Sequence, residues 1–278
     1  MAQNYASKTL SKIDERWNLE AKTALICNKG MTIEFNGVNS VTIYNVDTVA
    51  EGDYTRSGAD RFGALVELGT GVQTMTLSQD KSFTFTVDRG NLEDSQMVQE
   101  ANKAVKRQVR EVSIPATDVY RLAVLTSYAD TNNQGAQGTT LLVSTTYAGI
   151  LTEQAALTDA LVPEEGRVCF IVPTVLNLLK RDPEFAKDCD KSYADSKTGV
   201  YGKVDGLTIV VIPSSYVMAK FQFMIVHEDV LVSPVKFNSV RVLDNQRGID
   251  GVVAEGRRYY DAFILGQKTD GIRLSLSA

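Results

Sequence analysis

A strand that runs directly into a long helix is the clearest pattern along this chain. Residues 82–87 alternate serine or threonine with phenylalanine or valine, which predicts a strand with one buried face. The alternation stops at residues 88–90, and Asn91 is a favourable cap for the start of a helix. Apolar residues then recur at steps of three or four, which predicts the buried stripe of that helix. These residues are Val98, Ala101, Val105, Val109 and Val112.

A proline interrupts this helical pattern. We expect Ile114-Pro115 to stop or kink the helix, because proline lacks the amide donor and clashes with the preceding turn. A second helical run, residues 119–128, continues the pattern beyond it. The surface of the helix alternates acids and bases at pairing distance, and its basic side is formed by Lys103, Lys106, Arg107 and Arg110. A solvated or intersubunit surface is the default interpretation of that side, with contact to phosphate as the alternative.

Two stretches precede the strand. Residues 7–26 predict an amphipathic helix, which packs on its own core or lies on a neighbour. Residues 32–77 show no helical period and few large apolar side chains. They predict short strands at 41–44, 64–68 and 73–77 around a polar stretch rich in turn residues. Because an isolated two-stranded ribbon is marginal in water, this segment needs a surface to lie on. A neighbouring subunit is the more economical choice, with packing on its own domain as the alternative.

The rest of the chain predicts a small α/β unit followed by short strands. A polar loop at 129–139 leads to a helix at 144–161 and a buried strand at 168–172. The next helix begins at Pro173 and ends at Asp182-Pro183. We list the remaining predicted strands by range: 207–212, 221–226, 230–232, 239–243, 251–255 and 259–265. The last four are expected to rejoin the sheet beside the long helix.

Composition adds few constraints. The chain has 278 residues, 44% of them hydrophobic, and a formal net charge of −5, which argues weakly against a dedicated nucleic-acid binder. No apolar run approaches the roughly 20 residues of a membrane span, and the first residues lack the apolar core of a secretory signal. Cys27, Cys169 and Cys189 are scattered, which fits packing residues in a reducing cytoplasm.

Chemical motifs are absent from the sequence. It contains no glycine-rich phosphate loop, no GxGxxG and no GxSxG, and His227 is its only histidine. We interpret His227 as structural. We interpret the acidic residues Asp188, Asp190 and Asp195 around Cys189 as a solvated loop. No catalytic, metal-binding or cofactor-binding residue is predicted. An α/β enzyme stays an alternative, since an acid–base site built from Asp, Glu, Lys or Tyr leaves no local motif.

The order of several segments resembles the major capsid proteins of tailed bacteriophages, which have the Hong Kong 97-type fold. The segments that carry the resemblance are KTALICNKGMTIEFNG, the stretch from VTIYNVDTVAEGDYTRSGADRFG to FTFTVDRGNLEDS, VQEANKAVKRQVREVSIPATDVYRLAVL, EEGRVCFIVPTVLNLLKRDPEF, VDGLTIVVIPSS and DGVVAEGRRYYDAFILGQKTDGI. Each segment is moderately specific, and together they cover most of the chain in the family's order.

The resemblance implies an α+β fold with four parts. Residues 1–31 would form an N-terminal arm, and residues 32–80 an extended β-hairpin loop. Residues 81–138 and 226–278 would form a peripheral domain around a spine helix that ends at Ile114-Pro115, with Asp118 and Tyr120 beyond it. Residues 139–225 would form an axial α/β domain.

The function implied by the resemblance is structural. Subunits would form hexamers and pentamers that close into an icosahedral phage head around double-stranded DNA, made in the cytoplasm of a host bacterium and found in the virion. The implied partners are other copies of the chain, a separate scaffolding protein, a portal at one vertex and weakly contacted DNA, with no membrane and no cofactor. A separate scaffold is expected because only about 30 residues precede the loop. Covalent crosslinking, known in some members, is not expected, because no lysine lies between Lys29 and Lys81.

Candidate intersubunit contacts are placed at the loop and on the arm. They are Tyr54, Arg56, Asp60 and Arg61 near the loop tip and Trp17 on the arm, with solvated charges as the alternative for the charged residues. Three other functions stay open. An encapsulin-type nanocompartment shell shares the fold, a tail-tube subunit would be dominated by β-strands, and an enzyme would need a deep pocket with perturbed carboxylates.

Overall fold

The structure of the protein is a computed structural model that divides into two compact units. One unit combines Met1–Met31 with Gln79–Ala278, and the other is Thr32–Ser78. We call them the body and the ribbon unit. The structure describes the following residues: 21–27, 35–36, 39–58, 60–90, 101–183, 185, 200–244, 246 and 248–278. The predicted helix cap Asn91 and the greater part of the predicted helix 7–26 lie outside these residues.

A three-stranded antiparallel sheet lies along one side of the body. Its strand order is β10 (Val235–Asp244), β11 (Gly251–Tyr260) and β4 (Gln79–Asp88). The predicted strand 82–87 lies within β4. The predicted strands 251–255 and 259–265 are not separate, because β11 runs without a break to Tyr260 opposite β4. The chain then turns, and β12 (Phe263–Ile264) pairs with β9 (Leu231–Val232).

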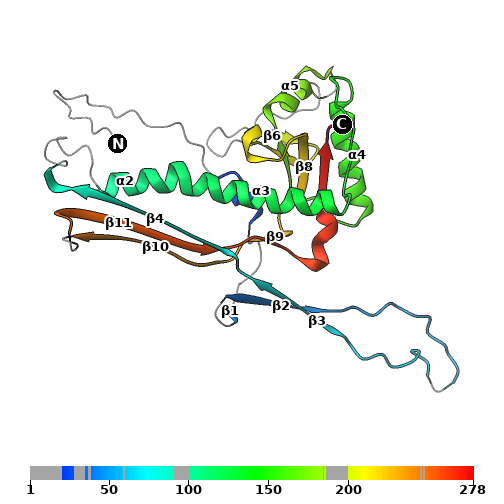
Figure 1. The fold of residues 1–278 in the computed structure, drawn as a ribbon. Coiled ribbons are helices and arrows are strands. Elements are labelled where there is room, and N and C mark those ends of the chain that lie inside the picture. The colour runs from blue at the N-terminus through cyan, green and yellow to red at the C-terminus, as the bar shows by residue number, and fades with distance from the viewer. Residues whose placement is uncertain are drawn as a thin grey trace. The chain divides into compact units, whose positions relative to one another are not determined.

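The spine helix extends through Ile114-Pro115 into the predicted second run at 119–128, so the end that the resemblance implied at this proline is wrong. It consists of α2 (Ala101–Gln108), the π-helical turn η2 (Val109–Ser113) and α3 (Ile114–Thr131), which run on as one long helix beside the sheet (Figure 1). In η2 the Ile114 N–H bonds the carbonyl of Val109, five residues back. The wider turn places Pro115 in the first turn of α3, where a missing amide donor costs least.

A five-stranded sheet forms the centre of the body. Its strand order is β13 (Ile272–Leu276), β8 (Phe221–His227), β5 (Arg167–Ile171), β7 (Leu207–Val211) and β6 (Val200–Val204). The pair β5–β7 is parallel and the other pairs are antiparallel. Every residue of β5 and β8 is buried, because both strands lie inside the sheet and both faces are covered.

Helices from distant parts of the sequence share this core. The helices are α3, α4 (Thr146–Asp159) and α5 (Pro173–Arg181), and Leu122, Leu125 and Leu157 have no exposed surface. Among the described residues, the body also contains three short 3-10 helices, η1 (Thr23–Ile26), η4 (Ser214–Tyr216) and η5 (Gly266–Gly271). The helices predicted at 144–161 and from Pro173 onward are therefore present, and their apolar side chains are buried in this core.

The end of the chain was not predicted as it lies in the structure. Strands β10 and β11 of the tail lie in the sheet beside the spine helix, as predicted, whereas β13, for which no strand was predicted, joins the five-stranded sheet. The polar segment after α3 runs along β13, since the Leu274 N–H donates to the carbonyl of Gln134 and the Leu276 N–H to that of Ala136, both at 2.9 Å. Gly135 has a φ of +111°, and a Cβ there would lie 2.2 Å from the Leu274 carbonyl oxygen. Only glycine fits this approach.

The ribbon unit is a small antiparallel sheet with a long connection. Its order is β1 (Phe35–Asn36), β2 (Ser40–Val46) and β3 (Thr70–Thr76). The predicted strand 64–68 is wrong, and the strand that returns is β3, which includes most of the predicted piece 73–77. The ladder between β2 and β3 ends where the Asp47 N–H donates to the Gly69 carbonyl at 3.0 Å. Residues 64–68 lie beyond this point and have no partner strand in the part of the chain that the structure describes.

Candidate interaction surfaces

A buried carboxylate attaches the first described residues to the spine helix. Asp118 in α3 is 2% exposed. Its Oδ2 accepts a hydrogen bond from the Lys22 N–H at 2.7 Å, and its Oδ1 accepts one from the Thr23 hydroxyl at 2.6 Å. Asp118 therefore caps the start of η1, although it lies far along the chain. We call this contact the arm joint, because it holds the first described residues, 21–27, on α3.

Neighbouring polar groups complete the arm joint. Arg121 donates to the Thr23 hydroxyl and to the Ser233 hydroxyl, both at 3.1 Å. Ser233 in turn donates to the Asp261 carbonyl at 2.7 Å, and the Tyr120 hydroxyl donates to the Asp261 carboxylate at 2.6 Å. Buried polar groups are stable only when they have such partners. The network therefore holds residues 21–27, the spine helix and the segment after β11 in one arrangement. Sequence reasoning had placed Asp118 and Tyr120 beyond the end of the helix, and it had named neither as part of such a network.

The two faces of the ribbon unit differ in exposure. On one face, the cross-strand partners Val41 and Met75 are buried. On the other face, Tyr44 lies opposite Val72, and they are 70% and 58% exposed. The alternation of a strand thus directs apolar side chains to both faces, and one of these faces is left open to solvent.

The tip of the ribbon unit contains a small turn. The Thr55 N–H donates to the Arg61 carbonyl at 3.0 Å, and the Arg61 Nε donates to the Gly58 carbonyl at 3.3 Å. The rings of Tyr54 and Phe62 meet edge to face, with centroids 4.9 Å apart. The structure therefore brings the predicted residues Tyr54 and Arg61 into one turn, while Arg56 and Asp60 are exposed beside it. The predicted residue Trp17 lies outside the described residues.

Exposed apolar side chains are concentrated in the ribbon unit. Sequence reasoning missed Phe62 and Leu65, which are 91% and 105% exposed, because the alternation at 64–68 was interpreted as a half-buried strand. Among the described residues of this unit, the exposed large apolar side chains are Tyr44, Val46, Val49, Tyr54, Phe62, Leu65, Val66, Leu68 and Val72. So many exposed large apolar side chains in one short segment are typical of an interaction site rather than of ordinary surface.

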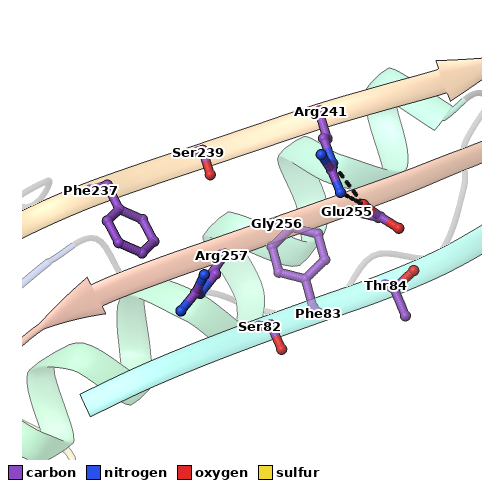
Figure 2. Close-up of a pocket in the computed structure, with 9 residues that line it drawn as sticks. All are labelled: Ser82, Phe83, Thr84, Phe237, Ser239, Arg241, Glu255, Gly256 and Arg257. Carbon is purple, nitrogen blue, oxygen red and sulfur yellow. Dashed lines mark hydrogen bonds and ion pairs between the residues drawn. The ribbon is translucent and has the colours of Figure 1, made fainter. Parts of the chain in front are cut away.

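The face of the β10–β11–β4 sheet that lies away from the spine helix contains a shallow groove of about 410 Å³ (Figure 2). Arg241 pairs with Glu255 at 2.7 Å, and Arg257 forms two hydrogen bonds to the Asp80 carboxylate. The Arg257 guanidinium also lies 4.9 Å from the centre of the Phe237 ring. Hydrogen bonds from Arg257 lower the pKa of Asp80, so the pair is ionised at neutral pH. The charges of this groove are therefore balanced within the chain.

His227, Cys27 and Cys169 lie in surroundings that suit a structural role rather than a catalytic one. His227 is 8% exposed, its Nε2 lies 2.9 Å from the Glu165 carbonyl, and its Nδ1 accepts the Asp229 N–H at 3.2 Å. Both ring nitrogens are thus engaged, with the proton on Nε2. Burial raises the pKa of Cys169 to about 12 and also raises that of Cys27, which makes both thiols poor nucleophiles.

The described residues contain no group of three His, Cys, Asp or Glu side chains that could hold a metal ion. The acidic residues around Cys189 lie outside them. None of their helices combines the length and the apolar character that crossing a membrane requires.

Comparisons with known proteins give a likeness of fold. No protein-family profile and no curated protein sequence matches the chain. A solved structure from Mycobacterium phage Che8 matches with a TM-score of 0.69 and 18% identity, over 99% of this chain and 98% of that one. The capsid structure of the cyanophage P-SCSP1u gives a TM-score of 0.69 and 10% identity, over 100% of this chain and 93% of that one. The mature capsid of bacteriophage PhiM1 gives a TM-score of 0.68 and 10% identity, over 99% of this chain and 92% of that one.

The likeness covers nearly the full length on both sides of each comparison. The chain therefore has a mixed α and β fold shared with chains of phage capsid structures.

Proposed function

We propose that this chain is the major capsid protein of a tailed bacteriophage, with the Hong Kong 97-type fold. Its copies assemble through hexamers and pentamers into an icosahedral head that encloses double-stranded DNA. The likeness of fold to the cyanophage and PhiM1 capsid chains supports this proposal over the whole length of the chain. The protein then acts as a wall rather than as a catalyst, and it is found in the virion.

The exposed apolar surface of the ribbon unit is the observation that carries the proposal. A small three-stranded ribbon with one face left open to solvent buries little apolar surface by itself. Covering Phe62 and Leu65 with a second copy would remove apolar area from water, at about 25 cal/mol per Å² before the cost of association. In this proposal the ribbon unit corresponds to the extended loop, and it lies on a neighbouring subunit.

The proposed partners follow from the proposed role. They are other copies of this chain, a scaffolding protein, a portal at one vertex and the packaged DNA. The arm beyond the arm joint contributes Trp17 to contacts with a neighbour, and the ribbon tip contributes Tyr54, Arg56, Asp60 and Arg61. No lysine between Lys29 and Lys81 is available for a covalent crosslink from the loop. Intact-mass measurement of assembled particles should therefore give single, uncrosslinked subunits.

Electron microscopy of the purified chain, with light scattering on the same sample, tests the proposal. The wild-type chain should form closed shells or rings of capsomer size. Replacing two exposed apolar residues, Phe62→Ser with Leu65→Ser, should weaken assembly, because apolar area that a second copy would cover is lost. The critical concentration for assembly should rise at least tenfold. A matched pair outside the ribbon unit, Leu142→Ser with Leu161→Ser, also removes two exposed apolar residues and should assemble like the wild type.

The outcomes separate the proposal from its rivals. A chain that stays monomeric at high concentration, with scaffold or crowding agent present, contradicts it. Equal loss of assembly in both pairs would mean that general surface polarity matters and the ribbon unit does not. Shells that hold a cargo protein in place of DNA would identify an encapsulin-type nanocompartment, which shares the fold.

A further inference from the structure

The three-stranded sheet of the body has a long strand at its outer edge. Strand β10 spans Val235–Asp244, and β11 lies on one side of it (Figure 2). Within the described residues, no backbone hydrogen bond reaches the other side of β10. The N–H and C=O groups along that side can therefore pair with a further strand.

Strand β10 has few of the features that protect a sheet edge from pairing. Protected edges are commonly short, or they contain proline, a bulge or unpaired charge. Residues 235–244 contain no proline, and the irregularity in their register lies at the start of the strand, before Phe237. Within 238–243 the one charged residue is Arg241, whose guanidinium pairs with Glu255 on β11 at 2.7 Å. The middle of this edge is therefore regular and has little net charge.

The other edge strand of the same sheet, β4, exposes a different kind of side chain. Its exposed residues are all polar or charged: Asp80, Lys81, Ser82, Thr84, Thr86 and Asp88. Strand β10 exposes Val240 and Val242, which are 42% and 40% exposed and lie on one face. An edge that combines open backbone groups with exposed apolar side chains is typical of a site for strand addition.

The sequence of β10 is complementary to itself when two copies run antiparallel about a two-fold axis at Val240. Residues at equal distances from Val240 then lie opposite each other and point to the same face. The two Val240 side chains meet at the axis, and Leu243 of each copy lies opposite Phe237 of the other. Arg241 lies opposite Ser239, so like charges do not meet there. Apolar pairs placed directly opposite each other stabilise a sheet.

The neighbouring registers are less favourable. With the axis at Arg241, the two guanidinium groups would lie opposite each other, which destabilises the pairing. With the axis at Ser239, both exposed valines in the middle of β10 would lie opposite polar residues, Asn238 and Lys236. The axis at Val240 therefore gives the best match of apolar side chains.

We propose that β10 is an interface for a second copy of this chain, in which the two β10 strands pair antiparallel about a two-fold axis at Val240. The two sheets then join into one continuous sheet. This inference rests on the proposed function for the second copy, and it adds a contact that the function alone does not specify. Adjacent subunits of a ring of five or six are not related by a two-fold axis, so the pair joins subunits of two rings.

Disulfide formation tests the register. In Val240→Cys the two introduced side chains lie opposite each other, with Cβ atoms about 4.5–5.5 Å apart, close to the range of a disulfide. The control Val242→Cys changes a residue of the same strand, face and exposure, but its two Cβ atoms lie about 14 Å apart. Mild oxidation of the full chain, in concentrated solution and in assembled particles, should give at least about tenfold more crosslinked dimer with Val240→Cys. The wild type reports the background from the native cysteines.

A mixture of two single variants tests the same register independently. Asn238→Cys in one copy lies opposite Val242→Cys in the other, so the two variants mixed before assembly should crosslink, and each variant alone should not. If a strand of a different protein takes the place of the second copy, Val240→Cys stays uncrosslinked, and the proposal is overturned. Equal crosslinking in Val240→Cys and Val242→Cys would also overturn it, because the contact would then be random.

A charge at the axis tests how much the contact contributes. Val240→Lys places two ammonium groups opposite each other and should weaken the association between rings about tenfold or more. The matched control Thr84→Lys adds the same charge at an exposed position of β4 and should associate like the wild type. Circular dichroism of both variants reports folding. Equal weakening in the two folded variants would contradict the proposal, since added charge anywhere on the sheet would then have the same effect.

The strand pairing and the proposed function can fail separately. Electron microscopy of the same samples reports assembly. If the wild type forms shells but Val240→Cys shells give no crosslinked dimer, the pairing fails and the capsid function stands. If no shell forms, but Val240→Cys crosslinks and Val242→Cys does not, the capsid function fails and the pairing stands.

Discussion

The five-stranded sheet and the ribbon unit both have apolar side chains in their strands, but the sheet buries them and the ribbon unit leaves one face exposed. In β5 and β8 every apolar side chain is buried, because helices and neighbouring strands of the same chain cover both faces. In β2 and β3 one face is covered and the other exposes Tyr44 and Val72. An apolar side chain stabilises the fold only when the chain itself covers it. Where the chain leaves such a side chain exposed, a partner that covers it gains the free energy of its burial.

The largest expected effect contrasts one leucine from each region. Leu125→Ala in α3 empties a fully buried position and should lower the free energy of unfolding by about 2–5 kcal/mol. Leu65→Ala in the ribbon unit removes a side chain that is already in solvent, so it should change that free energy by less than about 0.5 kcal/mol. Chemical denaturation of the unassembled chain, followed by far-ultraviolet circular dichroism, measures the free energy of unfolding of both variants. If both variants lost the same free energy of unfolding, the contrast between the covered sheet and the exposed ribbon unit would be wrong.

A smaller effect sharpens the comparison with polar groups. The arm joint is covered by the chain itself, as the sheet core is, although it consists of hydrogen bonds. Asp118→Ala leaves the Lys22 and Thr23 amides without their acceptor, and should cost about 1–3 kcal/mol in the free energy of unfolding. Hydrogen exchange at residues 21–27 should become faster, because η1 loses its cap.

The control for the arm joint comes from the same helix. Asp130→Ala removes an exposed aspartate of α3 and should change the free energy of unfolding by less than about 0.5 kcal/mol. It should leave hydrogen exchange at 21–27 unaltered. Unchanged exchange in the Asp118 variant as well would mean that apolar packing, and not the carboxylate, holds the first described residues on the spine helix.

Sequence patterns predicted the elements whose period is local. The continuous apolar run at 168–172 lies within one residue of β5, and the helical spacing at 144–161 corresponds to α4. The alternation at 82–87 corresponds to the middle of β4, and that at 41–44 to the middle of β2. In each case the side chains that face the core repeat at the period of the element, so a short window is sufficient.

The errors come from contacts that a short window does not contain. Residues 64–68 alternate like a strand but have no partner strand among the described residues. Pro115 does not end the helix, because the π-helical turn before it shifts the hydrogen bonds by one residue. Strand β13 was not predicted at all, since its pairing with β8 joins residues about 50 positions apart. At the candidate surfaces, composition pointed to Tyr54 and Arg61, but only the coordinates reveal that Phe62 packs against Tyr54.

The smallest expected effect concerns an ionisable group within the well-covered region. Glu153 in α4 is 8% exposed, and burial raises its pKa, an effect that Arg273 and the backbone of Ala136 partly offset. The folded chain therefore holds a proton on Glu153 more tightly than the unfolded chain does. Its contribution to stability is fully present below the unfolded pKa and is lost as the pH rises through the folded pKa.

Glu153→Gln removes this pH dependence while it keeps the size of the side chain. The variant should gain stability relative to the wild type at pH 7 and should not gain it at pH 4, as measured by denaturation at both pH values. Glu51→Gln, in the exposed loop of the ribbon unit, removes the same formal charge and serves as the control. If Glu153→Gln is instead less stable than the wild type at pH 7, attraction between the carboxylate and Arg273 outweighs the cost of burial. The covered region would then tolerate a charge because it supplies a partner, as the arm joint does for Asp118.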